Sequence, residues 1–359
     1  MDSILSLSAV FEPVRQPIIV TGEGKVIFAN IAALGAFGKD VTETPPDQLF
    51  PPEMLSNTAE RLMCSVELLG KRAKVLAIRR GSNRIFYLDP EPDEAASGIM
   101  ITSHMSSYLR NCVTGLKIAA DRCFSQLETG GAPDPRLVSI LYHYYYRLAR
   151  SITQIDSADK LCRREFSFRP APMDLSEVCQ TFIETLSSLT SDRGVKINFT
   201  AEPGRLIAFA DSSLVEMLLL NLFSNCLKNC SPGDEISLDL SRDPGKIALS
   251  LGDTGQGIPE NELSEIFSLP TNNSVFLHEG IGLGLFISHE IVRLHGGTLL
   301  IESREGEGVH IRVLLPTGDE STGVLNSPRA EYSTGGMSLF LTGLADAIPS
   351  SHYGLKFED

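Results

Sequence analysis

Two asparagines and a lysine stand at helical spacing in the apolar segment LLLNLFSNCLKNC, residues 218–230. Asn221, Asn225 and Lys228 fall at positions i, i+4 and i+7, so a helix here would present all three on one stripe. Carboxamide oxygens can coordinate a hard cation such as Mg²⁺, and an ammonium group can face phosphate oxygens. The stripe therefore predicts a metal and phosphate site, with a polar surface stripe as the alternative.

A second motif combines a carboxylate with glycines. Strand-like runs at residues 236–240 and 247–251 lead into the sequence GDTGQGI, residues 252–258. Asp253, at a strand end, can accept a hydrogen bond from an exocyclic amine, while Gly255 and Gly257 let a flat base lie against the backbone. The motif predicts a binding site for a nucleotide base.

A third motif, GIGLGL, spans Gly280 to Leu285 and runs directly into the helix-like segment FISHEIVRL. Its glycines, Gly280, Gly282 and Gly284, allow backbone amides to approach a ligand closely, and a helix N-terminus attracts phosphate. Leu283 stands between the second and third of these glycines and belongs to the same motif. Taken alone, such a stretch is also compatible with a tight turn that has no ligand.

Between the second and third motifs, an acidic helix is predicted to end near Phe267, and a polar segment spans Thr271 to Glu279. Glycines at the exit of this polar segment favour a mobile lid over bound phosphates. The lid contains no arginine or lysine that could reach a γ-phosphate.

The middle of the chain has helical periodicity. Two helices are predicted here, and the sequence GGAP at 130–133 separates them. Each helix carries one stripe of apolar residues. The stripes are Leu109, Val113, Leu116, Ala120, Cys123 and Leu127, then Leu137, Leu141, Tyr144, Leu148, Ile152 and Ile155. Because one helical hairpin buries little surface, we expect a homodimer that completes a four-helix bundle.

Composition limits the class of protein. A formal net charge of −14 argues against binding to nucleic acid or anionic membranes. No apolar run reaches the roughly 18 residues of a membrane span, and no basic leader precedes the first apolar stretch, so we expect a cytoplasmic protein without a membrane span. The seven cysteines are scattered, and Cys226 and Cys230 are interpreted as buried apolar residues rather than metal ligands.

The order of the motifs resembles the ATP-binding domain of the gyrase, Hsp90, histidine kinase and MutL superfamily. After the three motifs, HGG at 295–297 and GEGVHIRVLLP at 306–316 continue the match, which spans Met173 to Pro316. The resemblance implies ATP and Mg²⁺ as cofactors. It implies the roles of the following residues: Asp253 on the adenine amine, Asn221 and Asn225 on Mg²⁺, Lys228 near the phosphates, and Gly255, Gly257, Gly280, Gly282, Leu283, Gly284 and Leu285 shaping the nucleotide site.

Within that superfamily the chain resembles sensor histidine kinases, because LRNCVTGLKIAA, Leu109 to Ala120, is similar to their LRTPLTxIxxxA stretch. Their phosphoacceptor histidine and acidic neighbour precede that Leu-Arg, where this chain has Ser107 and Tyr108. A serine hydroxyl needs a base that Tyr108 does not supply. His104, three residues earlier, is a candidate substitute acceptor, with an ordinary exposed histidine as the alternative.

The N-terminal part has two strand-like runs within residues 17–30, a short helix at 31–37 and a three-strand meander at 65–69, 73–80 and 84–88. This order resembles PAS-type sensor domains. The segment ANIAALGAFG, residues 29–38, is similar to the segment that begins with the family's asparagine. The role of this N-terminal domain is either to sense a ligand, or to dimerise and relay a signal without a ligand.

We therefore expect an α+β multidomain chain. It divides into a PAS-like α/β domain (1–98), a two-helix dimerisation hairpin (99–170), an α/β-sandwich ATP-binding domain (171–318) and a C-terminal extension (319–359). In this extension, the apolar Met337 to Ile348 is expected to dock as a short helix on the body of the chain or on a partner. The resemblance implies a histidine kinase that passes the γ-phosphoryl group of ATP to a hairpin side chain and then to a response regulator. The alternatives are a pseudokinase that signals by conformation or heterodimerisation, and a serine kinase or ATPase on the same scaffold.

Overall fold

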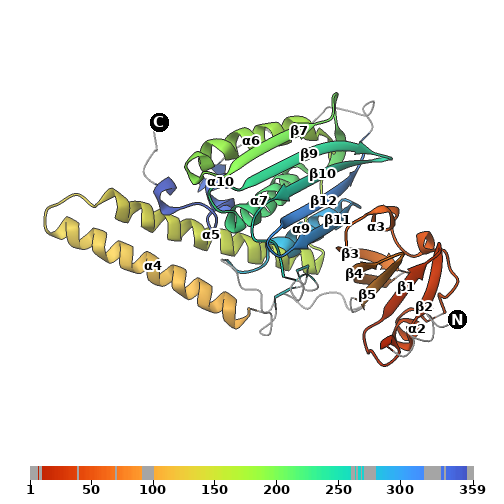
Figure 1. The fold of residues 1–359 in the computed structure, drawn as a ribbon. Helices are drawn as coiled ribbons and strands as arrows, with labels where there is room; N and C mark the ends of the chain where they lie inside the picture. Colours follow the sequence, from red (N-terminus) through yellow and green to blue (C-terminus); the bar gives the residue numbers. More distant parts are fainter. Residues whose placement is uncertain are drawn as a thin grey trace.

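A computed structural model describes residue 7 and residues 10–38, 40–68, 71–90, 101–259, 263, 266–267, 269–270, 280–318, 333–334 and 337–353. Among these residues, ten strands form one sheet in the order β2-β1-β5-β4-β3-β11-β12-β10-β9-β7 (Figure 1). The first five strands in that order come from the N-terminal part of the chain, and the rest come from the region that carries the three motifs.

The N-terminal strands follow the predicted order. They are β1 (Ile18–Gly22), β2 (Lys25–Ala29), β3 (Arg61–Leu68), β4 (Lys71–Arg80) and β5 (Asn83–Pro90), with α2 (Ile31–Phe37), η1 (Pro46–Gln48) and α3 (Pro52–Ser56) between β2 and β3. The strands extend a few residues beyond the predicted runs because hairpin pairing continues to the turns. The predicted boundary after β5 lies mostly outside the described residues.

Asn30 fixes the start of α2 against β1. Its side chain is fully buried, and its oxygen accepts hydrogen bonds from the backbone N–H groups of Ile18 (2.9 Å) and Ala33 (3.0 Å). The second of these is an N-cap bond to the helix. Its amide group donates to the carbonyl oxygens of Val14 and Gln16. One polar side chain thus satisfies several buried backbone groups at once.

Two long helices form a hairpin, α4 (Ser103–Glu128) and α5 (Pro135–Arg163). Thr102 caps α4 by accepting from the backbone N–H of Met105, and Asp134 caps α5, with Pro135 at its first position. In Figure 1 the far end of the hairpin projects away from the rest of the molecule. No described helix is long and apolar enough to cross a membrane.

The buried face of the hairpin differs from the predicted stripes. The buried residues of α4 are Met105, Tyr108, Cys112 and Ala119, one position away from the predicted seam, and the predicted Val113 and Leu127 are 54% and 52% exposed. The two helices approach closely at Gly115, where a Cβ would lie 2.2 Å from the Tyr144 ring, and the buried residues of α5 include the polar Arg150 and Gln154. The predicted seam is therefore not the contact within one hairpin.

The motif-bearing region places helices on one face of its strands. The helices are α6 (Leu175–Thr190), η2 (Ser191–Arg193), α7 (Ser212–Asn229) and α9 (Gly284–Leu294); the strands are β6 (Ala171–Asp174), β7 (Lys196–Ala201), β8 (Ile207–Ala210), β9 (Glu235–Asp243), β10 (Lys246–Asp253), β11 (Thr298–Arg304) and β12 (Gly308–Pro316). Alternate residues of β10, such as Leu249 and Leu251, are buried in one core with these helices. This core positions α7 and α9 beside the end of β10.

The two parts of the sheet meet where β3 pairs antiparallel with β11, at Leu300↔Cys64 and Ile301↔Met63. Apolar side chains cross this junction in both directions, since Leu300 is buried in the N-terminal core and Met63 in the other. Such pairing covers two strand edges that would otherwise be open.

The C-terminal segment comprises β13 (Ser333–Thr334), β14 (Met337–Ser338), α10 (Leu339–Gly343) and η3 (Ser350–Tyr353). It contacts α5 and α7, and its residues Phe340, Leu344 and Ile348 are buried in the core of the motif-bearing region. The predicted docking of this segment is confirmed, although its helix is shorter than the apolar periodicity suggested.

Candidate nucleotide-binding site

The predicted stripe of polar residues lies on α7. Asn221 and Asn225 both face the start of α9, because a methyl group added at Gly284 would lie 3.8 Å from the side-chain oxygen of each. Asn221 is 5% exposed, and its oxygen accepts a hydrogen bond from Nε2 of Gln154 on α5 (3.3 Å). Its Nδ2 has no hydrogen-bond partner among the described residues. A buried polar atom of this kind at the predicted site suits a polar ligand.

Asp253 is held at the end of β10 by neighbouring backbone and by α7. Its Oδ1 accepts from the N–H groups of Gly255 (3.0 Å) and Val309 (3.3 Å), and the Cys226 thiol also donates to the carboxylate. Burial raises the pKa of Asp253 above its usual value, although these hydrogen bonds act in the opposite direction. The carboxylate is thus oriented beside the helix that carries Asn225.

Glycines around Asp253 are required by close backbone approaches. A Cβ at Gly255 would lie 2.4 Å from the carbonyl oxygen of Asn229, at the end of α7. Gly257 has φ +69° and would place a Cβ 2.1 Å from the carbonyl oxygen of Arg304. Both glycines of the second motif therefore pack the β10 loop against α7 and the β11–β12 turn.

The glycine stretch leads into α9 as predicted. Gly280 and Gly282 have φ values of +115° and +78°, a region that favours glycine. Leu283 is fully buried and anchors the turn, whereas Leu285 is half-buried on the helix. Leu283, the N-cap residue of α9, provides no side-chain cap, which suits an N-terminus that receives a phosphate.

Lys228 lies beside the first glycine and also beside a residue that the sequence analysis missed. A Cβ at Gly280 would lie 3.3 Å from the Lys228 Nζ and 3.0 Å from Oδ2 of Asp346. Nζ and Oδ2 are 3.7 Å apart and form an ion pair. Asp346 comes from the C-terminal segment. The sequence signals its importance only in that it is the one charged residue in the apolar run 337–348.

The structure separates the two candidate acceptors on α4. His104 is half-buried, and its Nε2 lies 2.9 Å from the carbonyl oxygen of Gly280, to which it donates. Ser107, at the position expected for the histidine, is exposed. Tyr108 is buried and donates a short hydrogen bond to Asp346. Of the two candidates, His104 is the one in contact with the glycine stretch.

The carboxamides of α7 are the candidate magnesium ligands that the structure describes. In the part of the chain that the structure describes, no three His, Cys, Asp or Glu side chains gather in a way that could hold a metal ion. The carboxamides of Asn225 and Asn221 fit a metal whose other ligands are phosphate oxygens and water. For Asn221 this requires release of its oxygen from Gln154. The predicted acidic helix and the lid lie mostly or wholly outside the described residues.

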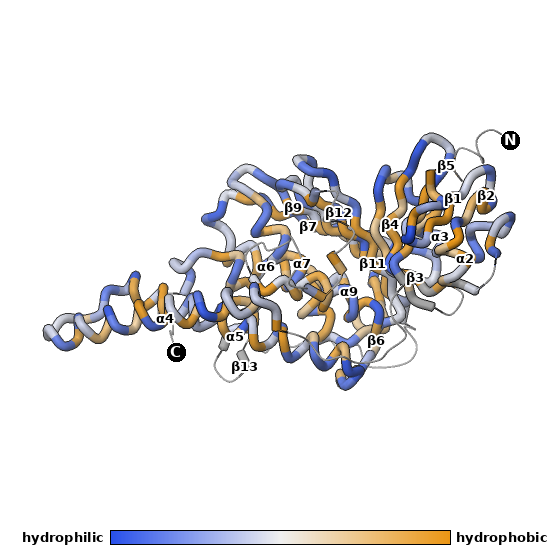
Figure 2. Tube along the Cα trace, turned by 90° about the horizontal axis from the view of Figure 1, so that it is seen from below, coloured by the Kyte–Doolittle hydropathy of each residue, from blue (hydrophilic) through white to orange (hydrophobic). Residues whose placement is uncertain are grey.

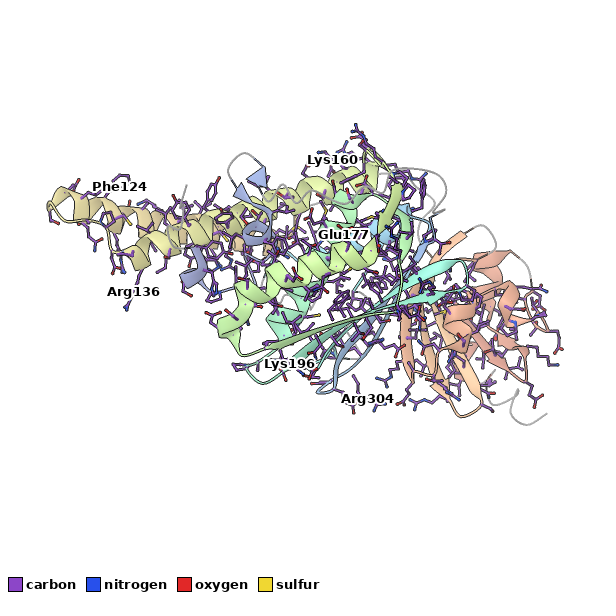
Figure 3. All side chains as sticks on the ribbon, turned by 90° about the horizontal axis from the view of Figure 1, so that it is seen from above. Phe124, Arg136, Lys160, Glu177, Lys196 and Arg304 are labelled. Atoms are coloured by element: carbon purple, nitrogen blue, oxygen red, sulfur yellow. The ribbon has the colours of Figure 1, made fainter. Side chains whose placement is uncertain are left out.

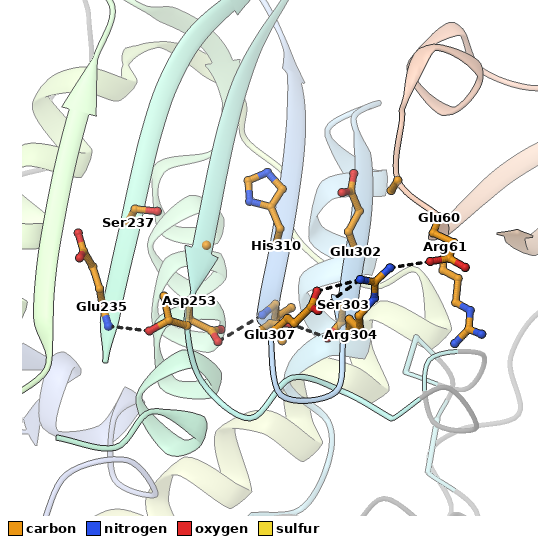
Figure 4. A pocket seen from close by; sticks show the side chains of 15 residues that line it. Glu60, Arg61, Glu235, Ser237, Asp253, Glu302, Ser303, Arg304, Glu307 and His310 are labelled. Atoms are coloured by element: carbon orange, nitrogen blue, oxygen red, sulfur yellow. Dashed lines mark hydrogen bonds and ion pairs between the residues drawn. The ribbon is translucent and has the colours of Figure 1, made fainter. Parts of the chain in front are cut away.

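An open cavity of about 530 Å³ lies at the junction between the two parts of the sheet (Figure 4). Ser237 and His310 line it from the sheet strands, and Glu60 and Arg61 line it from β3 and the residue before it. The Arg304 guanidinium bridges the junction to Glu60 at 2.6 Å. Asp253, at the end of β10, is also among the residues that line this cavity.

Two cysteines and the second histidine of the hairpin contribute to packing. Cys226 and Cys230 are buried, as predicted, and burial raises the pKa of the Cys230 thiol to about 12. His143 on α5 donates from Nε2 to the carbonyl oxygen of Ala345 (2.9 Å) and stacks on Tyr353, so it packs the C-terminal segment. Sequence reasoning did not identify Gln154, because its partner lies on a different element.

Comparison with known proteins gives the class of the motif-bearing region. Residues 210–319 match the family model described as Histidine kinase-, DNA gyrase B-, and HSP90-like ATPase. The chain is also similar to two curated proteins named adaptive-response sensory kinase SasA. The one from Prochlorococcus marinus is 32% identical over 183 residues, which cover 48% of this chain and 47% of that protein. The one from Crocosphaera subtropica is 26% identical over 253 residues, which cover 67% of this chain and 65% of that protein.

Among solved structures, the Acinetobacter baumannii histidine kinase AdeS superposes with a TM-score of 0.47 and 15% identity, over 59% of this chain and 98% of that chain. A superposition of this quality adds nothing to the assignment. The chain spans between about half and two thirds of the length of the two curated relatives.

The family match and the relatives confirm the predicted resemblance to sensor histidine kinases of the gyrase, Hsp90 and histidine kinase superfamily. Residues 210–319, which match this ATPase family model, contain all three motifs.

Proposed function

We propose that the chain is a sensor histidine kinase that binds Mg·ATP between α7, the end of β10 and the glycine stretch. It transfers the γ-phosphoryl group to His104 and then to an aspartate of a response regulator. The observation that carries this proposal is the contact between His104 and the carbonyl oxygen of Gly280, 2.9 Å apart. This contact joins the one histidine near the start of α4 to the stretch expected at the phosphates.

The chain's own residues would act mainly by positioning, as is general for phosphoryl transfer. Asp253 would accept a hydrogen bond from the adenine amine, and the uncapped N-terminus of α9 would receive phosphate oxygens. Asn225 and Asn221 would hold Mg²⁺, and Lys228 would offset phosphate charge. ATP supplies the phosphoryl group, and Mg²⁺ neutralises the developing charge on its oxygens.

The other parts of the chain fit the same function. The strand order β2-β1-β5-β4-β3 supports a PAS-like sensor domain within residues 1–98. The exposed apolar residues of the hairpin, within 99–170, support a homodimer, with residues 171–318 as the ATP-binding domain and 319–359 as an extension. Paired strands β3 and β11 offer a direct connection between the sensor and ATPase parts.

Two alternatives are favoured by specific observations. Ser107 stands at the expected histidine position and is exposed, which favours a serine kinase or ATPase on the same scaffold. The absence of arginine and lysine in the lid sequence, residues 271–279, favours a pseudokinase that binds ATP and signals by conformation.

Incubation of the full chain with Mg²⁺ and ATP labelled at the γ-phosphate separates these three functions. A histidine kinase incorporates a label that acid removes and base does not. Acid-stable label would indicate phosphoserine and support the serine kinase. Measurable ATP binding with no incorporated label would support the pseudokinase.

A further inference from the structure

Four side chains from three elements converge on the carboxylate of Asp346. Tyr108 donates a hydrogen bond to Oδ1, and Arg147 Nε lies 3.1 Å from the same oxygen. Arg150 Nε and Lys228 Nζ lie 3.3 Å and 3.7 Å from Oδ2. Asp346 and Arg150 are almost completely buried, with side-chain exposures of 3% and 4%. We call these four residues, without Asp346, the anion site.

The anion site carries more positive charge than Asp346 neutralises. Three cationic side chains contact one carboxylate, so the contacting groups sum to +2. The Nη1 atom of the buried Arg150 has no hydrogen-bond partner among the described residues. A buried guanidinium group is costly unless it is paired with charge and hydrogen-bonded. A phosphate group, with about −1.5 to −2 charges at neutral pH and three acceptor oxygens, matches this site better than a carboxylate does.

The anion site adjoins the glycine stretch. The position of a Cβ on Gly280 would be 3.0 Å from Asp346 Oδ2 and 3.3 Å from Lys228 Nζ. Lys228 is on the same helix stripe as Asn221 and Asn225, which face Gly284. The Asp346 carboxylate therefore lies beside Lys228, at the end of the nucleotide site where the phosphates are expected to bind.

The segment that carries Asp346 is attached by contacts of its own. His143 donates to the carbonyl oxygen of Ala345, and Leu344 and Ile348 are buried on either side. His352 pairs with Asp192 at 3.1 Å, away from the anion site. These contacts hold Asp346 in place without using the groups expected to bind the nucleotide.

We propose that the C-terminal segment, residues 337–353, is an intramolecular inhibitor whose Asp346 occupies an anion site for the terminal phosphate of a nucleoside triphosphate. Arg147 and Arg150 of the hairpin, with Tyr108 and Lys228, bind that phosphate when the segment is displaced. This inference rests on the proposed ATP-binding function and adds two arginines to its site. It also supplies the cationic groups that the lid sequence lacks.

The test compares nucleotide affinities of the full chain and its Asp346→Asn variant, which has nearly the same shape and no charge. Without the competing carboxylate, the variant binds ATP about tenfold or more tightly, because a buried charge contact is removed from competition. The gain is smaller for ADP and absent for AMP, which has no terminal phosphate to reach the anion site. Asp239→Asn, which removes an exposed carboxylate on β9 outside this segment, leaves ATP affinity unchanged.

The outcomes separate this inference from the proposed function. If wild type binds ATP and Asp346→Asn binds it equally or more weakly with unchanged AMP affinity, the inhibitor is contradicted and the ATP site stands. If neither protein binds any nucleotide, the proposed function fails and the inhibitor fails with it.

If Asp346→Asn does not fold, hydrogen exchange of the wild-type chain tests whether ATP displaces the C-terminal segment. ATP, but not AMP, then accelerates exchange of the Ala347 and Ile348 amides, which bond to the Leu344 carbonyl. Unchanged exchange at saturating ATP contradicts displacement of the segment.

Discussion

His104 and Ser107 are one helical turn apart, but they have different surroundings. His104 contacts the carbonyl oxygen of Gly280, whereas Ser107 is exposed on α4. An acceptor must lie close to the phosphoryl group that it attacks, because positioning provides much of the rate. The geometry therefore favours the histidine over the serine at the expected position.

We expect His104→Gln to abolish acid-labile labelling from γ-labelled ATP. Glutamine can still donate to the Gly280 carbonyl, but it has no nucleophilic imidazole nitrogen. Ser107→Ala is the matched control and retains the label. His143→Gln tests the other hairpin histidine and also retains it. Persistent labelling of His104→Gln, or its loss in Ser107→Ala, would assign the acceptor elsewhere.

The positions of candidate site residues were predictable where those residues are close in sequence. The stripe of Asn221, Asn225 and Lys228 follows from helical spacing, and the structure brings the two asparagines to Gly284. Asp346 was not predictable, because its partners Arg147 and Lys228 lie on two distant helices. A charged residue within an apolar run shows that a buried partner is needed but does not identify it.

At the scale of elements, the turn between β11 and β12 supports the end of β10. Gly306 and Gly308 both have positive φ, +80° and +90°. A Cβ at Gly306 would contact nothing within 4 Å, whereas a Cβ at Gly308 would lie 1.9 Å from the carbonyl oxygen of Asp253. The two glycines therefore differ only in the space beside them.

Gly306→Ala should lower the free energy of unfolding by about 1–2 kcal/mol, the cost of a left-handed backbone for an L residue. Gly308→Ala should lower it by about 1–3 kcal/mol more, because the methyl group overlaps the Asp253 backbone. Urea unfolding measures both, and ATP titration should show weakened binding for Gly308→Ala alone. Equal stability of the two variants would show that the turn does not press on Asp253.

Strands and helices of the two α/β parts were predicted well, because alternation and periodicity are local signals. The exact bounds of α2 and the position of α7 are examples. The pairing of β3 with β11 was not predictable, since two exposed edges do not specify each other. The buried residues of α4 are displaced by one position from the predicted stripe, and Gly115 lets the Tyr144 ring of α5 approach α4 closely.

At the scale of the molecule, the hairpin leaves a row of apolar side chains uncovered. Val113, Phe124 and Leu127 share one face of α4 and are 54%, 64% and 52% exposed, and Ile152 of α5 is 64% exposed. Figure 2 shows hydrophobic positions along the projecting part of α4, and Figure 3 places Phe124 near its far end. A second copy of the hairpin would cover these residues in a four-helix bundle.

We expect Phe124→Glu to weaken dimerisation about tenfold or more, because a buried aromatic anchor is replaced by a charge at the interface. Ile31→Glu is the control, because Ile31 is 67% exposed at the start of α2, outside the hairpin. Sedimentation equilibrium measures the association constants. A wild-type chain that is monomeric at all concentrations, or an effect of Ile31→Glu equal to that of Phe124→Glu, would contradict the dimer.

The account as a whole depends on an ATP site formed by α7 and the end of β10. Its most direct test is a titration of the full chain with Mg·ATP, together with Asn225→Ala, Asp253→Ala and the control Asp239→Ala, an exposed carboxylate on β9. We predict saturable binding to wild type and to the control, and no measurable binding to the other two variants while their folds are retained. Unchanged affinity in both Asn225→Ala and Asp253→Ala would contradict the account.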